Sequence, residues 1–164
     1  MPENRTDELY RALQEKGYPD EYNCAEKIIN GANEAYHLGL DEDSTRLFAA
    51  FGGGLAIGDT CGAVCSSLGV ISRLFVADTA RKSELLKLII CDFMKRFQEK
   101  TGSLKCAELK KKYAANGQKC AYILESAGEI LDQIIEKYAD YIIEAYRQDV
   151  NPQPECSPQD RRIG

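Results

Sequence analysis

Apolar residues recur at intervals of three and four along most of the chain, which is the spacing of one face of an α-helix. This pattern predicts helices over residues 6–16, 24–36, 41–51, 61–75, 79–100 and 118–148. No stretch shows the strict alternation of apolar and polar residues that is typical of a half-buried strand. We therefore expect an all-α protein, a single-domain bundle of about six helices with a long C-terminal helix.

Residues at the expected helix ends support this division. Asn23 and Glu26 form a capping-box pattern at the start of the second helix, and Thr60 is expected to cap the fourth. Three consecutive glycines, Gly52 to Gly54, are too flexible for a helix interior, so we expect a loop between the third and fourth helices. A further short helix is expected to begin near Cys106.

The last predicted helix is the longest and is followed by a proline-rich segment. Its length suggests that it projects past the core or forms the seam of a homodimer, although its apolar residues do not follow a clean heptad repeat. We expect residues 151–164 to be a mobile tail in which Cys156 has no particular role. The expected domain is therefore residues 1–150.

Composition narrows the possible functions. The chain has 164 residues and a formal net charge of −5, which makes the anionic backbone of a nucleic acid a poor partner. No apolar run approaches the length of about 18 residues that a membrane span requires, so no such span is expected. The polar and acidic N-terminus does not resemble a signal peptide. These features predict a cytoplasmic protein.

The chain contains seven cysteines but a single histidine. In a reducing compartment cysteines rarely form structural disulfides, so metal binding or redox chemistry is the better explanation for the high count. Cys91 is the exception, because it lies among apolar residues in the middle of the fifth predicted helix. We expect Cys91 to be part of the core.

Cys24 and Cys61 fall at the first positions of two different predicted helices. A thiolate there accepts hydrogen bonds from unpaired backbone N–H groups and lies at the positive end of the helix dipole. Cys65 follows one turn after Cys61, on the same helix face. Gly62 and Ala63 are small, so another backbone or a bound cofactor can approach this turn closely. The pattern predicts a reactive or metal-binding sulfur at Cys61.

Four cysteines share a place at or near a predicted helix start: Cys24, Cys61, Cys106 and Cys120. If these helix starts converge, four thiolates suit an iron–sulfur cluster or zinc, and the protein would transfer electrons. A second interpretation is a thiol–disulfide protein in which Cys61 attacks and Cys24 or Cys65 resolves the mixed disulfide. A third is a non-catalytic helical interaction protein in which the cysteines only pack.

These cysteine contexts resemble the C_GCAxxG_C_C family of redox-active proteins between about Tyr22 and Ala127. The shared features are an early cysteine (Cys24), a glycine-rich stretch before Cys61-Gly62-Ala63-Val64-Cys65-Ser66, and two later cysteines (Cys106 and Cys120). Two positions depart from the pattern, because Ser66 replaces the final glycine and Cys65 adds a fifth candidate sulfur. The resemblance implies a redox role, as an oxidoreductase or an electron-transfer protein with a redox partner protein, and leaves the substrate undefined.

Overall fold

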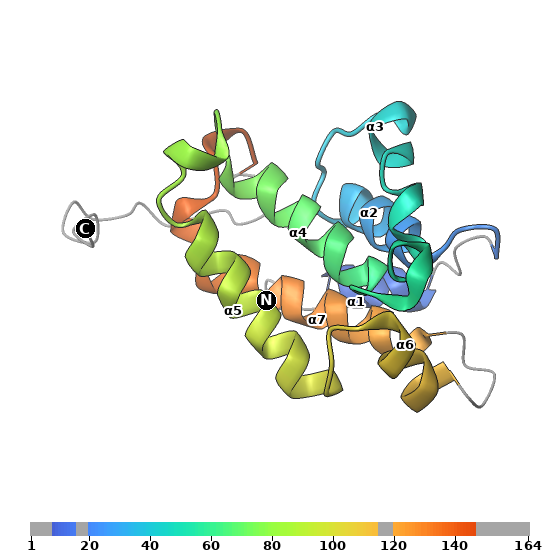
Figure 1. The fold of residues 1–164 in the computed structure, drawn as a ribbon. Coiled ribbons are helices and arrows are strands. Elements are labelled where there is room, and N and C mark those ends of the chain that lie inside the picture. Colours follow the sequence, from blue (N-terminus) through green and yellow to red (C-terminus); the bar gives the residue numbers. More distant parts are fainter. Residues whose placement is uncertain (1–7, 16–19, 115–119, 147–164) are drawn as a thin grey trace.

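The computed structural model describes residues 8–15, 20–114 and 120–146, which form helices joined by short connections (Figure 1). The α-helices are α1 (Glu8–Glu15), α2 (Cys24–Ala35), α3 (Glu42–Arg46), α4 (Gly62–Phe75), α5 (Leu86–Thr101), α6 (Cys106–Leu109) and α7 (Ala121–Lys137). Shorter helical turns span Ala49–Phe51, Gly54–Gly58, Ala80–Lys82, Lys110–Ala114 and Ala139–Tyr141. Within these residues the extended backbone pairs only at an isolated bridge between Thr60 and Lys105. The all-α prediction is therefore confirmed.

Helices α4 and α7 form the centre of the molecule. α4 packs against α2, α5 and α7, while α7 also packs against α1, α2 and α5. Their apolar stripes are fully buried, as Ile71 and Leu74 of α4 and Leu131 and Ile134 of α7 show. Burial of each such side chain stabilises the fold by about 1.5–3 kcal/mol. This core fixes the position of α2 relative to α4, and the candidate site lies where these two helices begin.

The start of α2 is held by a complete capping box. The Asn23 side chain accepts hydrogen bonds from the backbone N–H groups of Ala25 (3.0 Å) and Glu26 (3.1 Å). In return, the Glu26 carboxylate accepts a hydrogen bond from the backbone N–H of Asn23 (2.9 Å), as the sequence predicted. Asn23 also donates from Nδ2 to the carbonyl of Ala49 (2.9 Å), which ties α2 to the segment before the glycine loop.

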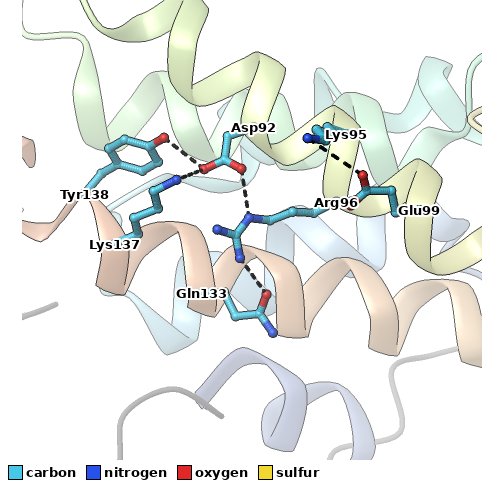
Figure 2. A network of polar contacts seen from close by, with 7 residues as sticks. All are labelled: Asp92, Lys95, Arg96, Glu99, Gln133, Lys137 and Tyr138. Carbon is cyan, nitrogen blue, oxygen red and sulfur yellow. Dashed lines mark hydrogen bonds and ion pairs between the residues drawn. The ribbon is translucent and has the colours of Figure 1, made fainter.

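A polar network joins α5 to α7 (Figure 2). Asp92 of α5 accepts hydrogen bonds from Arg96 Nε (2.9 Å), Lys137 Nζ (2.7 Å) and Tyr138 Oη (2.8 Å). Arg96 also donates to Gln133 Oε1 (3.1 Å). Burial would raise the pKa of Asp92, but the three hydrogen bonds outweigh it and lower the pKa from 3.8 to about 2. The network thus stabilises the ionised form of Asp92 and clamps two core helices together.

The last helix is shorter than the sequence predicted. α7 is the longest helix in the described part of the chain, but it ends at Lys137 rather than near Gln148. The chain then turns back onto α4, where the backbone N–H of Ile143 donates to the carbonyl of Leu74 (2.9 Å). Ile142 and Tyr146 are buried there, so the segment completes the core and does not project beyond it. The homodimer stays a prediction, and the expected tail at 151–164 and Cys156 lie outside the described residues.

Two other predicted helices are also broken. The third was expected over residues 41–51 but stops at Arg46, and only the turn Ala49–Phe51 follows before the glycines. The fifth was expected from Thr79 but begins at Leu86, because the Ser83 backbone is extended and its hydroxyl donates to the carbonyl of Phe75 (3.3 Å). None of the helices in the described ranges combines the length and apolar character needed to cross a bilayer.

Candidate functional site

The site is built where α2 and α4 begin. Cys24 is the first residue of α2, as predicted, and Cys61 occupies the N-cap position immediately before α4. The prediction that Thr60 caps α4 was wrong, because Thr60 pairs with Lys105 in the isolated bridge. Around this bridge the backbone N–H of Cys61 donates to the carbonyl of Leu104 (2.8 Å). A contact distant in sequence therefore sets where α4 begins.

The side chains of Cys24 and Cys61 interact where α2 and α4 begin, and this interaction shifts the pKa values of the two thiols in opposite directions. The hydrogen bond from Cys61 lowers the pKa of Cys24 from 9.0 to about 6, against the opposing effect of burial. Backbone N–H groups of Gly53, Ala25 and Ala63 donate to the same sulfur and lower the pKa of Cys24 further. A thiolate on Cys24 is thus stabilised by donors from α2, the glycine loop and α4.

Cys61 responds in the opposite direction. Its hydrogen bond to Cys24, its own burial and the neighbouring charge on Cys24 together raise the pKa of Cys61. Cys61 is only 3% exposed, whereas Cys24 is half-buried and reaches the surface of a pocket. These opposite pKa shifts favour a charged Cys24 and a protonated Cys61, whereas the sequence predicted that Cys61 attacks, and that role stays a prediction.

The glycine loop makes this close approach possible. Gly53, Gly54, Leu55 and Ala56 all have φ between 59° and 64°, so four consecutive residues form a left-handed turn. Such φ values are costly for Leu55 and Ala56. Within α4, a Cβ atom on Gly62 would lie 2.8 Å from Cys24 Sγ and 2.6 Å from the carbonyl oxygen of Phe51. Only glycine fits beside the Cys24 sulfur at that position.

Cys106 and Cys120 also lie near the starts of α2 and α4, Cys106 beside the glycine loop and Cys120 in a pocket that Cys24 lines. A Cβ on Gly54 would lie 2.5 Å from Cys106 Cβ, and the backbone N–H of Cys106 donates to the carbonyl of Asp59 (2.6 Å). Cys120 precedes α7 with a φ of 65° and lines one pocket together with Cys24. Burial raises the pKa of both thiols, and the charge on Cys24 adds to the effect.

The other residues that the sequence singled out lie in α4 and α5. Cys65 is half-buried one turn into α4, where burial and then the charge on Cys24 raise its pKa. Gly62 and Ala63 are both buried, and Ala63 is one of the N–H donors to Cys24. Cys91 is exposed, so its assignment to the core was wrong. Ile89 and Phe93 occupy the buried face of α5, and Cys91, two residues from each, lies on the opposite face.

The described cysteines are all free thiols. No group of three or more histidine, cysteine or acidic side chains in the described ranges is arranged to hold a metal ion. The four sulfurs expected to bind a metal, Cys24, Cys61, Cys106 and Cys120, therefore surround one region without forming a ready ligand set.

The pocket beside Cys24 was not expected from the sequence. It has a volume of about 400 Å³, and its lining includes Cys24, Cys120, Lys27, Lys110 and Asp20. Lys27 follows Cys24 by three residues in α2, a spacing that places both on one helix face. The sequence could therefore have placed Lys27 next to Cys24. It could not have placed Lys110 there, because the position of Lys110 depends on how α6 and the following turn fold against the site.

The structure is therefore that of an all-α protein with two thiols, Cys24 and Cys61, at adjoining helix starts. The sequence profile described as "Putative redox-active protein (C_GCAxxG_C_C)" matches residues 22–134. The chain belongs to this family, as its cysteine pattern had indicated. No curated protein and no solved structure matches the chain significantly.

Proposed function

We propose that this protein is a thiol–disulfide oxidoreductase in which Cys24 attacks a substrate disulfide and Cys61 resolves the product. The observation that carries this proposal is the placement of the two thiols at the adjoining starts of α2 and α4, where the interaction with Cys61 lowers the pKa of Cys24 to about 6. A thiol with a pKa near the ambient pH combines a high thiolate fraction with useful nucleophilicity. Cys24 also faces a pocket, whereas Cys61 lies behind it in the core.

The reaction begins when the Cys24 thiolate attacks one sulfur of the substrate disulfide. A bond forms between Cys24 Sγ and that sulfur, and the other substrate sulfur leaves as a thiolate that takes a proton from water. Cys24 is then neutral, so the hydrogen bond and the charge that raised the pKa of Cys61 are gone. The N–H groups of Ala63 and Val64, which lower the pKa of Cys61, remain in place.

In the second step Cys61 releases its proton to water and attacks Cys24 Sγ. The Cys24–Cys61 disulfide forms, and the bound substrate sulfur leaves as a second thiolate. Two electrons have then passed from the cysteine pair to the substrate, which ends as two thiols. A redox partner protein with a dithiol would return the pair to its reduced form, and a reducing compartment such as the cytoplasm would supply one.

Peptide mass spectrometry after a limited dose of hydroxyethyl disulfide tests this assignment. The wild-type protein should form the Cys24–Cys61 disulfide, and Cys61→Ser should accumulate a mixed disulfide on Cys24. Cys24→Ser should leave Cys61 unmodified, because Cys61 is buried. Cys91→Ser is the matched control, since it removes an exposed thiol far from the pair. Absence of a Cys24–Cys61 link in the wild type would contradict the proposal.

A metal-bound form is the second candidate function. Cys106 packs against Gly54 beside the glycine loop, and Cys120 shares the pocket with Cys24, so these two sulfurs and the Cys24–Cys61 pair surround one region. An iron–sulfur cluster or zinc held by these four residues would supply electron transfer or structural chemistry. Metal analysis and a visible spectrum after anaerobic purification decide between the two candidates, since a stoichiometric metal with four protected thiols would favour the metal-bound form.

A further inference from the structure

The pocket beside Cys24 has dimensions suited to a small molecule. Its volume of about 400 Å³ lies within the range of about 300–1,000 Å³ that is usual for small-molecule sites. Cys24 lies in its wall at the start of α2, and Cys120 lies in the wall formed by the start of α7. A disulfide that enters this pocket reaches the Cys24 sulfur, while Cys61 stays buried behind it.

Two lysines from separate elements belong to the same lining. Lys27 comes from α2, and Lys110 comes from the turn that follows α6. Within the described residues neither ammonium group forms an ion pair, and the positive charge of each reaches Cys120 across the pocket. Asp20 is the acidic member of the lining. The lining therefore offers two cationic groups in the same pocket as Cys24, the cysteine that reacts.

We propose that the substrate is a small disulfide that carries carboxylate groups, which Lys27 and Lys110 bind while Cys24 attacks its sulfur. This inference rests on the proposed function, because it assumes that Cys24 exchanges with a disulfide. Ammonium groups bind carboxylates as point charges and raise the local concentration of an anionic substrate. The exchange itself is the one given above: the substrate disulfide is reduced to two thiols, and Cys24 and Cys61 are oxidised to a disulfide.

Three alkyl disulfides that differ mainly in charge test the inference. They are dithiodipropionate, which is anionic, hydroxyethyl disulfide, which is neutral, and cystamine, which is cationic. The second-order rate of Cys24 modification, followed by peptide mass spectrometry on the full chain, should be highest for dithiodipropionate. Its advantage should shrink as salt is raised from low ionic strength, because salt screens exposed charges over about 10 Å at 0.1 M.

Lysine variants identify the groups responsible. Lys27→Gln and Lys110→Gln should each slow the reaction with dithiodipropionate by about tenfold, at the lower end of the range known for electrostatic steering, and leave hydroxyethyl disulfide unaffected. Lys27→Arg and Lys110→Arg should retain most of the wild-type rate. Lys87→Gln is the matched control, because it removes the same charge from an exposed position on α5.

The outcomes separate this inference from the proposed function. If all three disulfides react at similar rates and still yield the Cys24–Cys61 disulfide, the proposed function stands and the anionic substrate is rejected. If Lys87→Gln slows dithiodipropionate as much as Lys27→Gln does, net charge and not the pocket is responsible, and the inference is likewise rejected. If none of the three disulfides produces the Cys24–Cys61 bond, the proposed function is rejected, and the inference that rests on it is rejected with it.

Discussion

Replacing Cys61 with alanine removes the donor that contributes most to the acidity of Cys24. With a pKa of about 6, Cys24 is about 90% thiolate at pH 7, whereas a thiol at its ordinary pKa of 9.0 is about 1% thiolate. If Cys61→Ala returned Cys24 fully to 9.0, the thiolate fraction would fall about 90-fold. The backbone donors Gly53, Ala25 and Ala63 remain in the variant, so the midpoint should lie between the two values.

The rate at pH 7 should change less than the thiolate fraction does. Nucleophilicity rises with pKa with a Brønsted coefficient of about 0.4–0.5, so a rise of three pKa units restores about 16- to 32-fold. The net loss of alkylation rate in Cys61→Ala is then at most about three- to sixfold at pH 7. The pH profile is therefore the more sensitive measurement, and above pH 9 the variant should react faster than the wild type.

The assay is the pH dependence of iodoacetamide alkylation, resolved by mass spectrometry for the Cys24 peptide. Cys61→Ser is the matched variant, because its hydroxyl still donates a hydrogen bond, and it should give a midpoint closer to that of the wild type than Cys61→Ala does. Cys91→Ser should leave the midpoint unchanged. A Cys24 midpoint that is the same in the wild type and in Cys61→Ala would refute the reasoning.

Three further substitutions probe the scaffold. Gly62→Ala places a Cβ 2.8 Å from Cys24 Sγ, so it should lower the free energy of unfolding by about 1–3 kcal/mol and displace the thiol, which would raise the alkylation midpoint of Cys24. Asn23→Ala removes the α2 cap and should cost about 1 kcal/mol in urea unfolding. Asp92 has a folded-state pKa of about 2, below its ordinary 3.8, so its ionised form stabilises the fold above pH 3.8 and this contribution disappears as the pH falls through about 2. Asp92→Asn should therefore lower stability at pH 7 by about 2 kcal/mol and flatten the pH dependence of unfolding between these values.

Gly62→Ala and Asp92→Asn each have an internal control. Gly69→Ala also overpacks α4, but its Cβ meets the Phe48 ring and not a cysteine, so it should destabilise the protein without moving the Cys24 midpoint. Glu99→Gln disrupts an exposed ion pair with Lys95 and should change stability by less than about 0.5 kcal/mol. Equal effects of Asp92→Asn and Glu99→Gln would contradict the importance given to the α5–α7 network.

Local sequence signals predicted the elements whose ends are determined locally. The capping box of Asn23 and Glu26 lies within four residues, so the start of α2 was predicted correctly. The N-cap of α4 was not, because Thr60 pairs with Lys105, which lies in a distant part of the chain. The end of α7 at Lys137 likewise depends on the return of Ile143 to Leu74. Periodicity in a single helix carries no information on such long-range contacts.

The candidate site shows the same division. The sequence indicated that Cys24 and Cys61 lie at helix starts and predicted that Cys61 is the attacking thiol, whereas the pKa shifts favour the charge on Cys24. That difference arises first from the interaction between the two thiols, then from the deeper burial of Cys61 and from the N–H of Gly53 in the left-handed turn. Leu55 and Ala56 adopt positive φ values that such residues rarely adopt, so the left-handed turn could not be predicted from their identity. Cys91 was misplaced because its apolar neighbours lie on two different faces of α5.

The backbone donors to Cys24 come from three stretches of chain that meet only when folding is complete. A nascent or unfolded polypeptide has seven thiols without this arrangement, each mostly protonated at neutral pH. The acidity of Cys24 therefore arrives together with the native state, and only the folded chain holds one cysteine mostly as a thiolate at neutral pH. Any change that separates the starts of α2 and α4 removes these donors and returns the pKa of Cys24 toward its ordinary value.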